Sequence, residues 1–261
     1  MLIVTLTTDW NQDDYYYGAI KGKLISSCSA LSIVDISHKI PSFNIARAAF
    51  ILRNSYYHFP EGSTHLICVN TEPSKDESLL AIEYKGHYFI GNDNGIFGLI
   101  LKDQPSAIIE LPPATEQTSF ASVDVFVNAV SHIANNGGLA GLGKAKESFN
   151  KSIPRRATID QDVINGSVLY IDSYQNAITN ITKELFERIG KGRQFEIALQ
   201  SNYYKLWRIN KTYGETSVGE LLALFNSLNL LEIAINKGNA SELLNLTTSS
   251  TIRVKFFDKK Q

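Results

Sequence analysis

The sequence predicts an α/β fold in two parts: an N-terminal, mostly parallel sheet flanked by helices, followed by a smaller antiparallel β-barrel or sandwich domain. Strand and helix patterns alternate from the start of the chain to about residue 143, whereas short β-rich runs fill the remainder. A polar stretch at 144–158, which contains Pro154-Arg155-Arg156, separates the alternating strand–helix part from the β-rich part. We therefore expect domains at 1–150 and 157–261, with 144–158 as the linker region.

Each predicted strand of the first part is an apolar run that ends at polar residues. Helical spacing at 13–26 and 44–57 separates the first three strands, with Asp13 and Asn44 in suitable N-cap positions. In open α/β sheets, ligands bind at the carboxyl ends of the strands, so the polar residues gathered there predict a binding site. The strands are expected at 2–7, 31–36, 65–69, 79–84 and 87–90.

The second part contains short β-rich runs without an internal repeat or a low-complexity tract. Spacing of this kind is typical of a small antiparallel barrel or sandwich. The runs are at 166–171, 195–199, 205–209, 221–225, 230–235 and 251–257.

Composition narrows the class of partner. The formal net charge is −1 and the basic residues are scattered, so neither nucleic acid nor an anionic membrane is expected, and a neutral small molecule fits better. The first strand reaches Asp9 without a basic flank, which argues against a signal peptide or a membrane span. The two cysteines, Cys28 and Cys68, and the five histidines lack the spacing of metal ligands, so we expect no metal site. Because Cys68 lies in an apolar strand pattern, where a buried reduced thiol is usual, we also expect a reducing, cytoplasmic setting.

An ordered set of segments, spread over nearly the whole chain, resembles one enzyme family. No single segment is specific, but together they resemble the S-adenosyl-L-methionine (SAM) hydroxide adenosyltransferases, relatives of the SAM-dependent fluorinating and chlorinating enzymes. His38 falls in one of these motifs, Asp35-Ile36-Ser37-His38, where we expect a structural role. The segments are 6–10, 17–22, 33–41, 59–65, 92–95, 171–180 and 226–238.

The resemblance implies a reaction, a ligand and an assembly. Members of this family direct water at C5′ of SAM and release adenosine and methionine without a cofactor. The sulfonium is a good leaving group, so the protein mainly aligns and desolvates the nucleophile and holds the substrate. Members form homotrimers that hold the ligand between the first domain of one subunit and the second domain of its neighbour, so we expect a homo-oligomer.

In the first part, the resemblance implies ligand contacts by Asp9, Phe43, Asn70, Phe120 and Ser122. Asp9 matches the carboxylate that binds the ribose diol, although a capping or loop role is the alternative. Phe43 matches an aromatic near the sugar, or else packs in the core or at a hinge. Ser122 matches a halide-binding serine of the fluorinating enzyme, but a helix-capping or compensating serine is the more ordinary interpretation.

In the second part, the resemblance implies contacts by Asp172, Tyr174, Asn176, Ser227 and Asn236. Asp172 matches the residue that pairs with the methionine ammonium, and Ser227 matches a contact to the methionine carboxylate. Tyr174 is expected to form the adenine wall, and the amides of Asn176 and Asn236 are expected to pair with adenine. The alternatives are a turn-capping aspartate and ordinary turn residues.

The catalytic positions depart from the family pattern. Where the hydrolysing members have an aspartate, an arginine and a histidine, this chain has Asn70, Glu77 and Ala121, so the catalytic residues are unknown. Loss of a positioned acid or base costs about a hundred- to ten-thousandfold in rate. The 70–74 loop also lacks both family glycines and their access to positive φ, so its backbone is expected to take another path.

Three functional hypotheses follow. The first is a family member that binds SAM and adenosine with weak or lost hydrolysis. The second is an active enzyme in which Glu77 or Asp76 orders the water. The third hypothesis is a sensor of a nucleoside or another metabolite, without catalysis. The retained binding residues and the altered catalytic positions together favour the first hypothesis, binding without efficient turnover.

Overall fold

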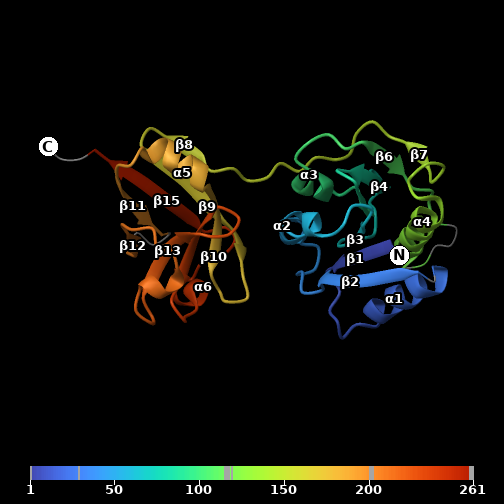
Figure 1. The fold of residues 1–261 in the computed structure, drawn as a ribbon, viewed down its shortest axis with the longest axis horizontal. Coiled ribbons are helices and arrows are strands. Elements are labelled where there is room, and N and C mark those ends of the chain that lie inside the picture. Colours follow the sequence, from blue (N-terminus) through green and yellow to red (C-terminus); the bar gives the residue numbers. More distant parts are fainter. Residues whose placement is uncertain (1, 29, 115–117, 119, 200–202, 259–261) are drawn as a thin grey trace. The chain divides into compact units, whose positions relative to one another are not determined.

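The computed structural model describes residues 2–28, 30–114, 118, 120–199 and 203–258. The chain divides into two compact units, Met1–Pro154 and Arg155–Gln261, each with its own sheet (Figure 1). The fold class is as predicted: a mostly parallel sheet with helices, then a nearly closed antiparallel barrel.

Seven strands among the described residues of the first unit form one sheet in the order β2-β1-β3-β5-β4-β6-β7. The pairs β1/β2, β1/β3 and β3/β5 are parallel, whereas β4, β6 and β7 join the sheet by antiparallel pairing. The carboxyl ends of the parallel strands consequently meet at one edge. The bounds are β1 (Leu2–Thr8), β2 (Leu31–Ser37), β3 (Thr64–Cys68), β4 (Leu79–Tyr84), β5 (His87–Asn92), β6 (Ala107–Glu110) and β7 (Lys144–Ala145).

Helices cover both faces of this sheet. Helices α1 and α4 lie on one face of the sheet and α2 and α3 on the other (Figure 1). Their apolar residues form the core on each face. Asn44 caps α2 as expected, because its side chain accepts a hydrogen bond from Arg47 N, whereas α1 is preceded by Asp14 rather than Asp13. The helices are α1 (Tyr15–Ser27), α2 (Ile45–Arg53), the 3-10 turn η1 (Tyr56–His58), α3 (Ile96–Ile100) and α4 (Ala121–Asn136).

The second unit is built around one antiparallel sheet in the order β12-β11-β15-β9-β10-β14-β13, with β8 paired to β9. A bridge between Asn210 and Leu224 brings the segment after β12 beside β13, which nearly closes the barrel. The strands are β8 (Thr158–Asp160), β9 (Val163–Ile171), β10 (Ala177–Thr182), β11 (Gln194–Ala198), β12 (Lys205–Leu206), β13 (Leu221–Phe225), β14 (Leu230–Ile235) and β15 (Thr251–Phe257). The helical segments are α5 (Lys183–Gly190), η2 (Tyr213–Glu215) and α6 (Ala240–Leu243).

Alternation along the strands explains the core of the barrel. β15 alternates exposed and buried residues, with Ile252, Val254 and Phe256 pointing inward. They pack against apolar residues of β9, β11 and β14. In the part of the chain that the structure describes, no helix has the length and apolar character needed to span a membrane.

Candidate functional site

The carboxylate of Asp9 ties two loops together at the carboxyl edge of the first sheet. Asp9 follows β1, and its Oδ2 accepts hydrogen bonds from the backbone N–H groups of Phe43 (2.8 Å) and Asn70 (3.2 Å). Both donor residues have positive φ, 64° for Phe43 and 50° for Asn70. Residues other than glycine rarely adopt this backbone region. One oxygen of Asp9 therefore organises the loops, and the other, Oδ1, has no hydrogen-bond donor among the described residues.

Phe43 and Asn70 stand on these loops, and neither side chain makes a hydrogen bond to another described residue. The side chain of Phe43 is 72% exposed, which argues against the core position that was one alternative for it. The half-buried side chain of Asn70 makes no hydrogen bond within the described residues, and the bonds that Asn70 does make use its backbone N–H and carbonyl groups. The structure thus brings Asp9, Phe43 and Asn70 together. In the part of the chain that the structure describes, Asp9 Oδ1 and the Asn70 side chain make no hydrogen bond, and the Phe43 ring is exposed.

Asn92, the last residue of β5, and Asn94, two residues later, hold the unusual backbone at Asn70. The Asn70 carbonyl oxygen accepts hydrogen bonds from Asn92 Nδ2 at 3.0 Å and from Asn94 Nδ2 at 3.3 Å. Asn94 Oδ1 also accepts from Ile96 N, at the start of α3. The sequence motif 92–95 marked these residues, but their local pattern carried no sign that they would fix a loop more than twenty residues earlier.

Glu77 closes the same loop on itself. Glu77 Oε2 accepts hydrogen bonds from Ser74 N at 3.0 Å and from Asn92 Nδ2 at 3.0 Å, while Glu77 N donates to Ser74 O. Asn92 is 1% exposed, so the Glu77 carboxylate satisfies a buried donor. The neighbouring Asp76 is exposed. Glu77 Oε2 therefore staples the loop.

The segment 120–122 lies beside the Asp9 turn through an aromatic contact. The ring of Phe120, the N-cap residue of α4, is 5.5 Å from the ring of Trp10, the residue after Asp9, and stacks on Tyr16 at 5.2 Å. Ala121 begins α4 and brings no titratable group. Ser122 lies within the first turn of the helix, so it is not the N-cap that the sequence allowed as its alternative role.

In the second unit, Asp172 organises the turn between β9 and β10. Asp172 Oδ1 accepts hydrogen bonds from Tyr174 N and Asn176 N, both at 2.9 Å, and Oδ2 accepts from Asn176 Nδ2 at 3.2 Å. The side chain of Tyr174 is 78% exposed at the tip of this turn. Asp172 therefore has the turn-capping role that was its alternative, and Asp172, Tyr174 and Asn176 lie together.

A buried carboxylate that the sequence motifs did not single out lies close to this turn. Glu232 is 2% exposed and accepts hydrogen bonds from Tyr213 OH (2.6 Å) and Asn226 Nδ2 (3.1 Å). Burial and the bond to Glu232 raise the pKa of the Tyr213 phenol, and the negative charge of Asp172 adds to this rise. The Tyr213 hydroxyl therefore lies within electrostatic reach of both carboxylates, near the predicted adenine and methionine contacts.

The structure separates Ser227 from Asn236. Ser227 is exposed in the turn before β14, whereas Asn236 follows the other end of that strand. At the ordinary rise of about 3.4 Å per residue, β14 alone is about 17 Å long. Asn236 Nδ2 donates to Thr216 O at 2.7 Å, and Asn236 Oδ1 has no partner among the described residues. A ligand that touched both residues would have to extend along β14.

Both halves of the chain match models of one family. Residues 4–143 match the SAM hydroxide adenosyltransferase N-terminal domain, and residues 166–253 match the C-terminal domain of the same enzymes. The chain belongs to the SAM hydroxide adenosyltransferase family. The resemblance carried by the ordered segments is thereby confirmed.

Relatives of this family match over almost their full length. The (R)-S-adenosyl-L-methionine hydrolase of Methanocaldococcus jannaschii is 29% identical over 263 residues, which cover 97% of this chain and 95% of the relative. The corresponding hydrolase of Thermus thermophilus is 28% identical over 268 residues, covering 96% and 98%. A fluorinase of Actinopolyspora mzabensis is 20% identical over 288 residues, covering 97% and 96%.

Solved structures share the fold. An uncharacterized conserved protein from Thermotoga maritima superimposes with a TM-score of 0.86 at 23% identity, covering 98% of this chain and all of the other. A conserved hypothetical protein from Thermus thermophilus gives a TM-score of 0.76 at 26% identity, with the same coverage. These structures show that the fold described above is that of a known group of proteins.

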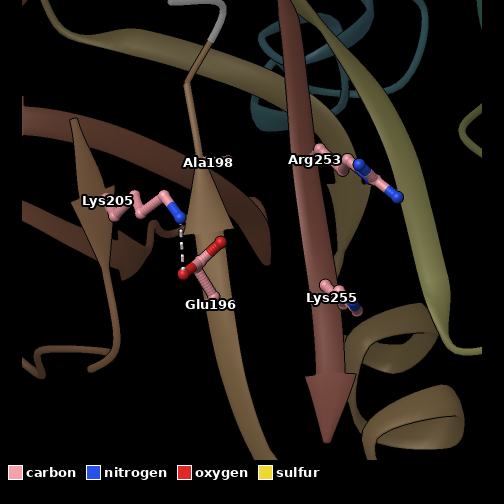
Figure 2. Close-up of a pocket in the computed structure, with 5 residues that line it drawn as sticks. All are labelled: Glu196, Ala198, Lys205, Arg253 and Lys255. Atoms are coloured by element: carbon pink, nitrogen blue, oxygen red, sulfur yellow. Dashed lines mark hydrogen bonds and ion pairs between the residues drawn. The ribbon is translucent and has the colours of Figure 1, made fainter. Parts of the chain in front are cut away.

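A charged cleft on the second unit contains none of the family's predicted ligand residues (Figure 2). It lies on β11, β12 and β15, where Ala198 is paired in register with both Lys205 and Arg253 and forms the floor between them. Lys205 is ion-paired with Glu196 at 3.0 Å. In the portion of the chain described by the structure, no group of three or more His, Cys, Asp or Glu side chains is arranged to hold a metal ion.

Proposed function

We propose that the protein binds SAM and adenosine, and that it hydrolyses SAM to adenosine and methionine slowly or not at all. Membership of the family supports SAM and adenosine as ligands. The hydrogen bonds of Glu77 support the proposed loss of hydrolysis. Its carboxylate is bonded to Ser74 N and Asn92 Nδ2, so the position that holds an arginine in hydrolysing members serves here as a loop staple.

The proposed contacts follow the chemistry of each ligand group. Asp9 Oδ1 would accept a hydrogen bond from the ribose diol, with Phe43 and Phe120 as apolar neighbours of the sugar. Tyr174 would stack on adenine, and Asn176 and Asn236 would pair with its polar edge. Asp172 would attract the methionine ammonium, and Ser227 would contact the carboxylate. No cofactor is required, because the sulfonium itself supplies the leaving group.

Weak turnover follows from the groups that remain near C5′ in this arrangement. Asn70 offers an amide where a carboxylate would take or orient a proton, and Ala121 offers a methyl group in place of an imidazole. Each missing acid or base group is worth about a hundred- to ten-thousandfold in rate. Adenosine and SAM would still bind, since Asp9 and the residues of the second unit are retained.

The test combines binding and turnover on the same preparation. Calorimetry with adenosine and with SAM should show heat of binding, while chromatography of a SAM incubation should show adenosine forming at least a hundredfold more slowly than with the Methanocaldococcus jannaschii hydrolase. Turnover at the rate of that hydrolase would overturn the proposed loss of activity. Absence of heat with adenosine, SAM and methionine would overturn the proposed ligand.

We also propose that the active form is a homotrimer, with the ligand held by the first unit of one subunit and the second unit of its neighbour. In support, the ligand residues fall in separate units of the chain, Asp9 and Asn70 in one and Asp172 and Asn236 in the other. Light scattering at micromolar concentration should give three times the mass of the 29.0 kDa chain. A monomeric mass would refute the assembly.

A further inference from the structure

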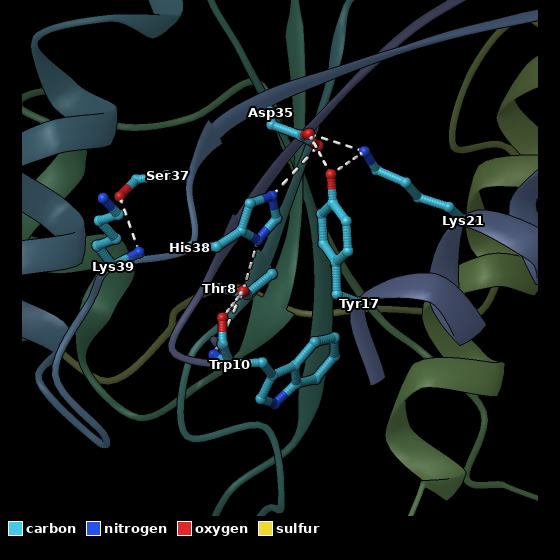
Figure 3. Close-up of polar contacts among 8 residues, drawn as sticks. All are labelled: Thr8, Trp10, Tyr17, Lys21, Asp35, Ser37, His38 and Lys39. Atoms are coloured by element: carbon cyan, nitrogen blue, oxygen red, sulfur yellow. Dashed lines mark hydrogen bonds and ion pairs between the residues drawn. The ribbon is translucent and has the colours of Figure 1, made fainter. Parts of the chain in front are cut away.

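Three side chains form a row that ends at the turn carrying Asp9 (Figure 3). Asp35 Oδ1, near the end of β2, lies 3.2 Å from His38 Nε2. On the other side of the ring, His38 Nδ1 lies 2.8 Å from the hydroxyl oxygen of Thr8, the last residue of β1. Thr8 Oγ1 in turn lies 3.3 Å from Trp10 N and 3.2 Å from Trp10 O. The row therefore connects the edge strand of the sheet to both neighbours of Asp9.

The carboxylate at one end determines the direction of these hydrogen bonds. Asp35 Oδ1 lies 3.2 Å from His38 Nε2, an electrostatic contact without hydrogen-bond geometry among the described residues. A negative oxygen at that distance favours the tautomer with the ring proton on Nε2, which leaves Nδ1 as an acceptor. Thr8 then donates its hydroxyl proton to Nδ1 at 2.8 Å in preference to the more distant Trp10 O at 3.2 Å, and its oxygen accepts from the N–H of Trp10. A hydroxyl that accepts from the backbone N–H two residues later fixes a tight turn, and Asp9 is the residue inside it.

Helix α1 holds the outer end of the row. Lys21 Nζ lies 2.7 Å from Asp35 Oδ2, and Tyr17 OH donates to the same oxygen at 2.8 Å (Figure 3). Partial burial alone would raise the pKa of Asp35, but the hydrogen bonds from Lys21 and Tyr17 and the contact with His38 lower it overall. Asp35 therefore stays ionised near neutral pH and keeps the direction of the row.

A hydroxyl, an imidazole and a carboxylate in a row also suggest nucleophilic catalysis. Burial argues against that role: Thr8 is 0% exposed and His38 is 3% exposed, so no substrate reaches the hydroxyl. Thr8 Oγ1 is also already bonded to the Trp10 backbone. What the row can do is hold the backbone on either side of Asp9.

We propose that His38 is a positioning residue that, through Thr8, holds the Asp9 turn so that Asp9 Oδ1 faces the ribose of a bound nucleoside. This inference rests on the proposed binding of adenosine. Asp9 Oδ2 is fixed by Phe43 N and Asn70 N, so a rotation of the turn would break those bonds or redirect the free oxygen. Loss of a hydrogen bond to a charged group weakens ligand affinity by roughly ten- to a hundredfold.

Two matched pairs of variants test this role. Thr8→Val removes the hydroxyl and keeps the shape, whereas Thr8→Ser keeps the hydroxyl. Asp35→Asn removes the charge that favours one imidazole tautomer. As its control, Asp124→Asn removes a carboxylate of α4 that is paired with Lys23 of α1. All are made with Trp207→Phe, which leaves Trp10 as the sole tryptophan, so that its fluorescence reports adenosine binding beside Asp9.

Thr8→Val should weaken adenosine binding about tenfold and Asp35→Asn about threefold, while Thr8→Ser and Asp124→Asn stay within twofold of the parent. The Kd for methionine, which the second unit would bind, should not change in any variant. Unchanged adenosine affinity in both Thr8→Val and Asp35→Asn would overturn the inference, and so would equal losses for adenosine and methionine. If the parent protein binds no adenosine, the proposed function itself has failed.

Discussion

The side-chain amide of Asn92 donates a hydrogen bond to the carboxylate of Glu77, with 3.0 Å between Asn92 Nδ2 and Glu77 Oε2. Sequence comparison alone suggested Glu77 as a substitute for a lost catalytic group. The contact gives it a different role, because the same oxygen also accepts from Ser74 N and thereby closes the loop that replaces the family's glycine-containing segment. The loss of an arginine at this position is thus accompanied by a new way of holding the loop.

Glu77→Ala should lower the free energy of unfolding by about 1–3 kcal/mol, since it leaves the buried Asn92 amide without one of its acceptors. Asp76→Ala, one residue away on the exposed side of the loop, should change it by less than about 0.5 kcal/mol. Urea unfolding of the two variants measures both values. Equal, small effects would show that Glu77 is not a staple. Loss of SAM turnover without loss of stability would instead favour a catalytic Glu77.

Restoring the missing groups should restore part of the reaction. Asn70→Asp breaks no side-chain hydrogen bond among the described residues, and Ala121→His places an imidazole at the start of α4, so the double variant should fold. We expect adenosine release from SAM to rise about tenfold or more over the parent chain, measured by chromatography. Glu77→Arg, by contrast, should cost stability because it removes the staple. A double variant that binds SAM without any gain in turnover would show that the path of the loop excludes the water.

Asp172→Asn should affect binding of the methionine part of SAM and leave binding of the adenosine part unchanged. The amide oxygen can still accept from Tyr174 N and Asn176 N, which keeps the backbone of the turn, while the negative charge and the bond from Asn176 Nδ2 to Oδ2 are lost. Affinity for SAM and methionine should fall about tenfold, because a charge-assisted contact to the ammonium is removed, and affinity for adenosine should stay the same. Calorimetry with each ligand distinguishes these outcomes, with Asp162→Asn, a partner of Arg193 on the surface, as the control. A parallel loss for adenosine would indicate that Asp172 acts only through the turn.

The fold was predictable where the pattern was local. The apolar runs at 2–7 and 79–84 became β1 and β4 with nearly the same bounds, because each is buried and ends at polar residues. The run at 205–209 was less reliable: only Lys205–Leu206 pairs as a strand, and Trp207 is 64% exposed. An apolar residue indicates a strand only when a partner strand buries it, and pairing depends on distant parts of the chain.

The candidate site shows the same division. Asp9, Phe43 and Asn70 were each identified from sequence motifs, but the single oxygen that joins them links residues 34 and 61 positions apart. Glu77 was a candidate, from its chemistry, for ordering the water, and only the position of Asn92 shows that its Oε2 staples the loop. Residue type indicates which reactions a side chain can perform. Its tertiary partners decide whether it is available to perform them.

A buried histidine pair should make the first unit sensitive to acid. His65 Nε2 lies 3.2 Å from His87 Nδ1, His65 Nδ1 is bonded to Thr5 Oγ1, and His65 and His87 are 0% and 5% exposed. Burial, and then the neighbouring charge of His87, lower the pKa of His65 to about 3, and burial also lowers the pKa of His87. Both rings are therefore neutral in the folded protein near neutral pH.

The unfolded chain, with an ordinary histidine pKa of about 6.5, takes up protons before the folded protein does as the pH falls. The stability that the neutral rings maintain is therefore complete above about pH 6.5 and is lost as the pH falls from there toward the folded pKa, by at most about 1.4 kcal/mol per pH unit for His65. Urea unfolding at pH 7.5, 6.5, 5.5 and 4.5 measures this slope. His65→Gln should be less stable at pH 7.5 but lose less stability toward pH 4.5, whereas His132→Gln, which leaves the buried pair in place, should keep the parent slope. Identical slopes in all three proteins would mean that proton uptake by His65 does not contribute to acid unfolding.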